Sequence, residues 1–176
     1  AAGYFSEEKT IKKNISSDSS RLLAGKLKDG MTIAAGGFGL CGIPENLIRT
    51  IAESGIKDLT IIGNNMGTDD KGMGLLLKNN QVSKVIASFV GDNKEFERQV
   101  IEGLLELELC PQGTLAEKLR AGGAGIPAFF TKTALGTVLA TNKPTQTFDG
   151  FEYVLEHSIK ADLSIIKSHV SDEAGN

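Results

Sequence analysis

Residues 31–44 read MTIAAGGFGLCGIP and carry the first signal of the fold. The unbroken apolar run at 31–35 is typical of a buried parallel strand. A glycine cluster at 36–42 follows directly. Pro44 then indicates the start of a helix, because the first turn of a helix has unpaired N–H groups and proline has none. The stretch therefore predicts a strand, a tight turn and a helix, which together form the repeating unit of an α/β fold.

The same alternation extends on both sides of this stretch. A helix is expected at 18–28, behind capping Ser and Asp residues, and Gly55 ends the helix that starts at Pro44. The further expected elements are strands at 59–62, 84–90 and 105–109, helices at 75–79, 92–102 (capped by Asp92) and 114–121, a hairpin turn at 148–151 and a strand at 162–167.

These elements predict an α/β protein with a mostly parallel sheet flanked by helices. From Val138 onward the pattern changes to a C-terminal β-rich portion. Neither a repeat nor a linker divides the chain, so we expect a single domain over residues 1–176, with an N-terminal arm at about 1–17.

Composition is that of a globular protein. The chain has 176 residues, of which 40% are hydrophobic and 23% charged, and its formal net charge is −3. A mildly acidic balance gives no basis for nucleic-acid binding, which basic surfaces favour. No apolar run approaches the roughly 18 residues needed to span a bilayer. The chain neither begins with Met nor carries a secretory signal, so we expect a start removed by processing or truncation.

Cysteine and histidine are too few to indicate a metal or a disulfide-stapled fold. Cys41 and Cys110 allow at most one disulfide, and a reducing compartment is expected. His157 and His169 have no partner at a metal-binding spacing, so no metal site is expected. Cys41 lies in the glycine cluster without a nearby base, and we interpret it as a buried, inert thiol.

Glycines gather in three places, at 36–42, 63–74 and 122–125, each interpreted as a loop. Residues 37–42 match the dinucleotide fingerprint G-x-G-x-x-G in the required strand-to-helix context. The next strand, however, runs into Asn64 and Asn65 instead of the acidic residue that holds a ribose. A phosphate-binding Walker loop is excluded, because no Lys-Ser/Thr pair follows Gly42. Three glycine loops together indicate a site lined by main chain.

The glycine stretch also resembles a known family, the α subunit of family I coenzyme A transferases. The motifs that carry the resemblance run in order from residue 29 to the C-terminus: Asp29–Thr32, Gly36–Leu47, Asn64-Asn65, Val90–Asn93, Phe96–Gln99, Pro111–Glu117 and Arg120–Phe129. Gly39–Asn46 and the Asn pair are most similar to succinyl-CoA:3-ketoacid transferases. Thr68 and Lys71 depart from the family pattern, and the chain stops where the family normally continues.

The resemblance implies a ping-pong transfer of CoA between carboxylic acids, through a glutamyl-CoA thioester. The nucleophilic glutamate belongs to a Ser-Glu-Asn-Gly motif on a β subunit, and this chain has no such motif. The chain is therefore expected to carry no catalytic nucleophile and to act only together with that β subunit, in an α2β2 heterotetramer. The coenzyme A thioester is a substrate, so no cofactor is implied. The cytoplasm is the expected location, or the mitochondrial matrix if the two halves are fused.

The site residues follow from the same resemblance. Asn64 and Asn65 would contact the coenzyme A chain, and Gln112 would support catalysis from the α side. The remaining expected CoA- and substrate-binding residues are Gly36, Gly37, Phe38, Gly39, Gly123, Ala124 and Gly125. The backbone N–H groups at 123–125 are assigned to the thioester oxyanion. Structural alternatives remain open, because the Asn pair also suits a turn and Gln112 a helix start.

Three other functions remain as alternatives. One is the α subunit of an acetate/butyrate-type CoA transferase, and another is an NAD-dependent enzyme using the glycine fingerprint. The third is a ligand-sensing module on a related sheet, which would need a basic phosphate pocket and a DNA-binding segment, and the sequence has neither.

Overall fold

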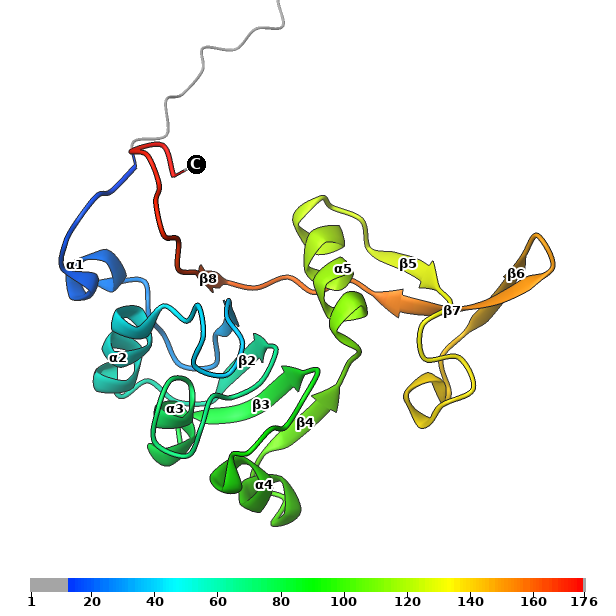
Figure 1. The fold of residues 1–176 in the computed structure, drawn as a ribbon, viewed down its shortest axis with the longest axis horizontal. Helices are drawn as coiled ribbons and strands as arrows, with labels where there is room; N and C mark the ends of the chain where they lie inside the picture. The colour runs from blue at the N-terminus through cyan, green and yellow to red at the C-terminus, as the bar shows by residue number, and fades with distance from the viewer. Residues whose placement is uncertain (1–12, 176) are drawn as a thin grey trace, which may run out of the picture.

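The structure is a computed structural model that describes residues 13–175. Most of the N-terminal arm expected at 1–17 therefore lies outside the described residues. A five-stranded sheet in the order β4-β3-β2-β1-β8 forms the body of the molecule, and every neighbouring pair is parallel (Figure 1). The strands are β1 (Thr32–Ala35), β2 (Leu59–Gly63), β3 (Val82–Ala87), β4 (Glu106–Leu109) and β8 (Leu163–Ile165). The predicted parallel sheet is confirmed.

Helices cover both faces of this sheet, because parallel neighbours need crossover connections. The helices are α1 (Ser19–Leu23), α2 (Glu45–Ser54), α3 (Gly74–Lys78), α4 (Lys94–Ile101) and α5 (Gln112–Gly123), with a short 3-10 helix η1 (Val138–Ala140). Side chains of α1 to α4 join one buried cluster with the strands, whereas Leu115 of α5 joins the cluster on the opposite face. The predicted flanking helices are confirmed.

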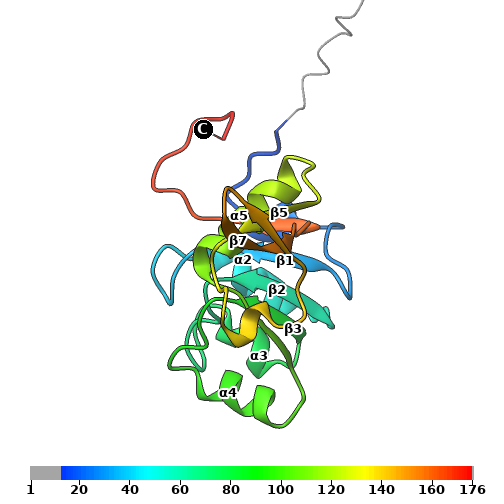
Figure 2. The ribbon, with the colours of Figure 1, turned by 90° about the vertical axis from the view of Figure 1, so that its right-hand side faces the viewer.

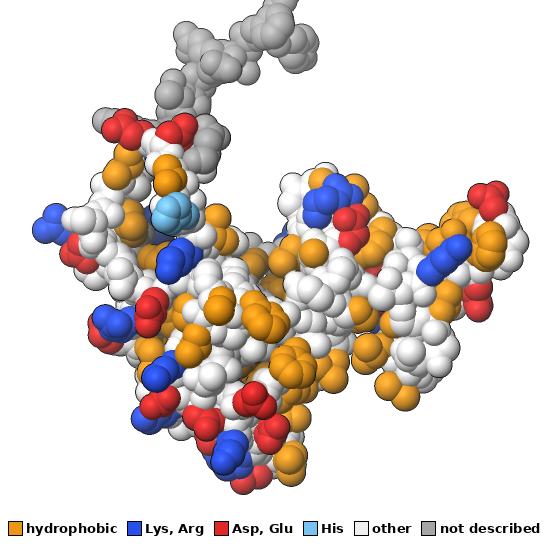
Figure 3. All heavy atoms as spheres, in the orientation of Figure 1, with side chains coloured by type: hydrophobic (Ala, Val, Ile, Leu, Met, Phe, Trp, Pro, Cys, Tyr) orange, Lys and Arg blue, Asp and Glu red, His pale blue; other side chains and the backbone are white. Residues whose placement is uncertain are grey.

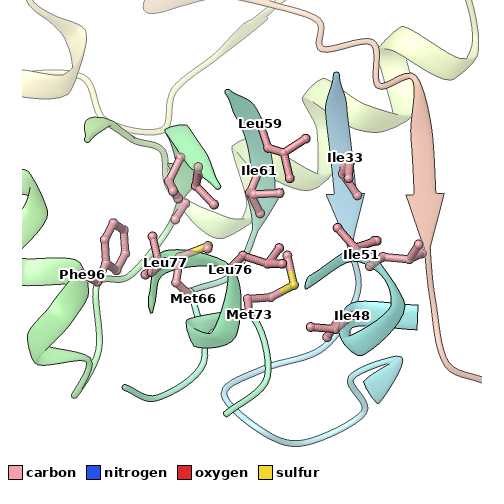
Figure 4. Close-up of a cluster of buried hydrophobic side chains, with 14 of the residues drawn as sticks. Ile33, Ile48, Ile51, Leu59, Ile61, Met66, Met73, Leu76, Leu77 and Phe96 are labelled. Carbon is pink, nitrogen blue, oxygen red and sulfur yellow. The ribbon is translucent and has the colours of Figure 1, made fainter. Parts of the chain in front are cut away.

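Successive strand residues supply these two clusters in turn, as strand geometry requires. Ile61 belongs to the larger cluster and Ile62 to the smaller one, and both are fully buried. Figure 4 shows the larger cluster, in which Ile33, Leu59 and Ile61 of the strands meet side chains of α2 and α3. Burial on both faces explains the apolar runs of the central strands, such as 33–35 in β1 and 61–62 in β2.

A second, three-stranded antiparallel sheet projects to one side of the body (Figures 1 and 2). Its order is β5-β7-β6, with β5 Ala128–Thr131, β6 Thr145–Phe148 and β7 Phe151–His157. Asp149 and Gly150 both have positive φ, 50° and 78°, which is the geometry of a two-residue hairpin turn. The predicted turn at 148–151 is confirmed. Apolar side chains lie on the surface of this sheet (Figure 3).

Several predicted boundaries are wrong. The helix expected at 18–28 ends at Leu23, because Ala24 leaves the helical region with ψ 126°. The strand expected at 84–90 spans Val82–Ala87. The cap of α4 is Asn93 instead of Asp92, since the Asn93 side chain accepts a 2.9 Å hydrogen bond from the Phe96 N–H.

The third glycine cluster is also placed differently from the prediction. Helix α5 begins at Gln112, two residues before the expected start, and includes Gly122 and Gly123. These two glycines are therefore helical and do not form a loop. Strand β5 lies before Val138, where the sequence pattern predicts that β structure begins. The prediction misses it because β5 is defined by its pairing with β7, a distant segment that the local sequence pattern does not show.

We predict opposite effects for alanine at these two adjacent glycines. A Cβ at Gly122 would lie 1.9 Å from the Ile159 carbonyl oxygen, whereas a Cβ at Gly123 meets no atom within 4 Å. Gly122→Ala should therefore lower the free energy of unfolding by about 1–3 kcal/mol. Gly123→Ala should raise it by about 0.5–1 kcal/mol through helix propensity. Urea unfolding measures both, and equal effects would contradict this packing.

Candidate functional site

The carboxyl ends of β1 to β4 lie at one edge of the parallel sheet, where open α/β sheets bind their ligands. The glycine loop at 36–42 follows β1, and Asn64 and Asn65 follow β2. Ser88 comes directly after β3, and Gln112 comes three residues after the end of β4. Three of the predicted site segments are therefore gathered at this edge, together with a serine that the sequence does not single out.

Three of these side chains form a hydrogen-bonded cluster, called here the amide cluster: Asn64, Ser88 and Gln112. Asn64 Nδ2 donates to Ser88 Oγ and to Gln112 Oε1, both at 2.9 Å. Ser88 Oγ donates to Gln112 Oε1 at 2.6 Å. Asn64 and Ser88 are half-buried and Gln112 is exposed. The cluster is uncharged and open to solvent on the Gln112 side.

Asn65 ties the glycine loop to the same edge. Its Oδ1 accepts hydrogen bonds from the N–H groups of Gly39, at 3.0 Å, and Gly67, at 3.5 Å. Gly37 has φ 112°, and a Cβ there would lie 2.6 Å from Ile43 Cγ2, so this position requires glycine. Asn65 therefore has a structural task in addition to any contact with a ligand.

Several N–H groups that a phosphate cradle would use are already paired in the glycine loop. Phe38 and Cys41 exchange backbone hydrogen bonds of 2.9 and 2.8 Å, and the Gly39 N–H is taken by Asn65. The helix that follows starts with Glu45, whose negative charge disfavours a phosphate at its N-terminus. These contacts argue against the dinucleotide-binding alternative.

Gly123, Ala124 and Gly125 are not part of this arrangement. They lie at the opposite end of α5 from Gln112, about 16 Å away along a helix that rises 1.5 Å per residue. The Ala124 N–H donates to Arg120 O at 3.0 Å and the Gly125 N–H to Gly122 O at 3.3 Å. The expectation that 123–125 form a loop of free oxyanion donors is therefore wrong.

No cysteine or histidine side chain of the described residues hydrogen-bonds to the amide cluster, although Cys110 lies two residues before Gln112. Both cysteines are free, and Cys41 is exposed, so its interpretation as a buried thiol is wrong: its turn projects from the surface. Burial raises the pKa of the Cys110 thiol. His157 and His169 are exposed. Within residues 13–175, no group of three or more His, Cys, Asp or Glu side chains is placed to hold a metal ion.

Ser88 is the member of the amide cluster that the sequence does not single out. The expected strand at 84–90 runs through it, which assigns it to the sheet interior. The structure ends β3 at Ala87, and Ser88 then occupies the position after β3 that Asn64 occupies after β2. A polar residue directly after a buried strand is the signal that could have found it.

A buried ion-pair network fixes α5, and with it Gln112, against the strands. Lys118 of α5 is 5% exposed and Glu156 of β7 is 2% exposed. Lys118 Nζ lies 3.0 Å from Glu156 and 3.3 Å from Glu108 of β4, and Lys143 Nζ lies 2.6 Å from Glu156. Burial opposes the charge of Glu156, but the hydrogen bonds from Lys143 and Lys118 outweigh it and hold its pKa below the ordinary value.

Large apolar side chains stand exposed around the carboxyl edge. Phe38 after β1, Phe89 after β3 and Ile166 after β8 are 62%, 54% and 71% exposed. Leu40, in the same loop as Phe38, is 43% exposed. Apolar side chains clustered beside a polar site are typical of a surface that another protein covers. No helix in the described part of the chain is long and apolar enough to cross a membrane.

Comparison with known proteins gives a consistent family. Residues 18–176 match the model of the coenzyme A transferase family. The A subunit of the succinyl-CoA:3-ketoacid coenzyme A transferase of Xanthomonas campestris is 57% identical over 159 residues, and the probable A subunit of the Bacillus subtilis enzyme is 57% identical over 158. Each match covers 90% of this chain and 66% of the relative, so the chain spans just under two thirds of their length.

Solved structures share the fold at lower identity. An acyl-CoA transferase from Escherichia coli O157:H7 superposes with a TM-score of 0.76 at 20% identity, over 85% of this chain and 33% of that one. Glutaconate coenzyme A-transferase from Acidaminococcus fermentans gives 0.74 at 20% identity, over 89% of this chain and 57% of that one. At this identity the likeness is one of fold.

The ion-pair network generates a stability prediction. Glu156→Gln leaves the buried Lys118 and the half-buried Lys143 without their shared partner, so we expect the free energy of unfolding at pH 7 to fall by about 3 kcal/mol. Glu117→Gln is the matched control, because its ion pair with Arg120 on the same helix is exposed and should cost less than about 0.5 kcal/mol.

Glu156→Gln also tests how the stability depends on pH. A carboxyl whose pKa is lowered by folding stabilises the protein above its ordinary pKa of 4.5 and loses that contribution as the pH falls. The wild type should therefore lose stability below about pH 4.5 more steeply than Glu156→Gln. Denaturant unfolding from pH 7 to pH 3 measures the difference, and parallel curves would contradict it.

Proposed function

Because this chain belongs to the coenzyme A transferase family, we propose that it is part of the A subunit of a succinyl-CoA:3-ketoacid coenzyme A transferase. The observation that carries the proposal is the 57% identity, over 90% of the chain, to the corresponding subunit of the Xanthomonas enzyme. The acceptor would be acetoacetate or a similar 3-oxo acid. The acetate/butyrate-type enzyme remains the alternative, and a panel of acceptor acids distinguishes the two.

In the proposed reaction, a glutamate carboxylate from the partner attacks the thioester carbonyl of succinyl-CoA and expels the CoA thiolate. The thiolate then attacks the glutamyl carbonyl of the resulting mixed anhydride, which releases succinate and leaves a glutamyl-CoA thioester. The second acid reverses these steps and leaves with CoA. Two covalent steps make a weak carboxylate nucleophile effective.

This chain would bind and orient the reactants. Amide side chains suit that task, because they donate and accept hydrogen bonds without placing charge beside the attacking carboxylate. Gln112 also stands at the first turn of α5, a twelve-residue helix whose N-terminal dipole favours negative charge. We assign Gln112 to the reacting centre, and Asn64, Asn65 and the loop Gly36–Gly39 to the CoA chain.

The partner subunit would cover the carboxyl edge. The relatives named above are A subunits by name, which supports a second, different subunit. The exposed side chains of Phe38, Phe89 and Ile166 offer an apolar surface to that partner beside the amide cluster. We propose an α2β2 heterotetramer in the cytoplasm; the bacterial origin of these relatives favours that location over the mitochondrial matrix.

The kinetics test the function. The complete protein, purified with the partner that carries Ser-Glu-Asn-Gly, should transfer CoA from succinyl-CoA to acetoacetate. Initial rates at several acetoacetate concentrations should give parallel double-reciprocal lines against succinyl-CoA, because the mechanism is ping-pong. Neither subunit should be active by itself. Intersecting lines, or transfer by this protein without its partner, would overturn the proposed division of labour.

Gln112→Ala tests the proposed role of the amide. Loss of one hydrogen bond to a charged reacting group costs about 1.5–3 kcal/mol, so kcat should fall about tenfold to a hundredfold while the native mass of the assembly stays unchanged. Gln146→Ala, at an exposed position on β6, is the control and should keep full activity. An unchanged rate for Gln112→Ala would remove Gln112 from the site.

A further inference from the structure

We propose that Ser88 is a positioning residue, which holds the Gln112 amide with its NH2 group turned toward the substrate. This inference rests on the proposed function, because it concerns the group that Gln112 presents. The amide of a free glutamine side chain rotates, and either its oxygen or its nitrogen then faces outward. The amide cluster removes that freedom through the direction of its hydrogen bonds.

Asn64 is the first residue that fixes which atoms of the cluster donate and which accept. Ser88 and Phe89 clamp the Asn64 backbone, since both of their N–H groups donate to Asn64 O at 3.1 Å. The two N–H bonds of Asn64 Nδ2 are both used, one on Ser88 Oγ and one on Gln112 Oε1. Asn64 Oδ1 is buried and has no hydrogen-bond donor among the described residues. An unpaired buried oxygen costs less than an unpaired buried N–H group. The Asn64 amide is therefore more stable with its nitrogen, and not its oxygen, directed at Ser88 and Gln112.

Ser88 passes this direction on to Gln112. The hydroxyl accepts from Asn64 Nδ2 and has one hydrogen to donate. Two acceptors lie within reach of that hydrogen, Gln112 Oε1 at 2.6 Å and the backbone oxygen of Asn64 at 3.2 Å, and the shorter distance favours Gln112. Gln112 Oε1 therefore accepts two hydrogen bonds, from Ser88 and from Asn64. If the Gln112 amide were turned over, its nitrogen would face the two groups that now donate to its oxygen. The oxygen of Gln112 is consequently held inward.

The consequence is a fixed donor on the open side of the cluster. Gln112 Nε2 has no acceptor among residues 13–175, and the side chain is exposed at the carboxyl edge. The group presented is thus an N–H donor, which suits a carboxylate or the oxygen that gains negative charge at a thioester carbonyl. Orientation fixed before the reaction lowers the cost of reaching the transition state.

The test uses the complete enzyme with its partner subunit. Ser88→Ala removes one of the two donors to Gln112 Oε1, so kcat should fall about threefold to tenfold, with KM for succinyl-CoA within about twofold. Ser88→Thr keeps the hydroxyl and should restore most of kcat. Ser83→Ala, the same change on strand β3 away from the cluster, should leave kcat unchanged.

A double-mutant cycle separates positioning from a general structural effect. If Ser88 acts through Gln112, Ser88→Ala should have no further effect on kcat in the Gln112→Ala background. Additive effects, a Ser88→Ala rate equal to wild type, or a Ser88→Thr rate as low as Ser88→Ala would each overturn the inference. A wild-type enzyme without CoA transfer would instead refute the proposed function, so the two failures are distinguishable.

Discussion

The parallel hydrogen-bonded ladder of β1 to β4 is the constraint on which the site depends. Asn64, Ser88 and Gln112 follow one another at intervals of 24 residues, one strand–helix unit each, and still share hydrogen bonds. They meet because Gly63 pairs with Ala87 and Ala87 with Leu109, so the chain leaves the three strands at the same level. A shift of one residue in either pairing would turn these side chains to the other face. The apolar residues that set the register therefore also place the site.

The sequence predicts this ladder well because burial leaves a strong local pattern. The central strands β1 and β2 are mostly apolar, and Pro44 and Gly55 mark the ends of α2. Features that depend on distant contacts leave no such pattern. Ser88 continues a run that favours strand structure, and only the neighbouring loops show that the strand has ended. Gly122 resembles a loop residue, but the close approach of Ile159 explains it within a helix.

Part of the candidate site can also be identified from the sequence. Asn64, Asn65 and Gln112 stand in recognisable motifs, whereas the role of Ser88 arises from a contact across the sheet. The same holds for Glu156, whose partners Lys118 and Lys143 come from α5 and from the loop before β6. Pairing between elements decides which polar residues are functional, and a single sequence shows only the residues that motifs contain.

The separation of charge within the chain supports the proposed division of labour between two subunits. Along the flank of α5 the two cations Lys118 and Lys143 balance the two carboxylates Glu108 and Glu156, whereas the amide cluster at the start of the helix has no ionisable side chain. A carboxylate nucleophile brought by a partner would thus meet neutral donors, which stabilise developing negative charge without forming an ion pair with the carboxylate in its resting state. Such donors act most strongly where water is excluded. This chain leaves the cluster open on one side, so covering by the apolar surface of a partner would complete the site physically as well as chemically.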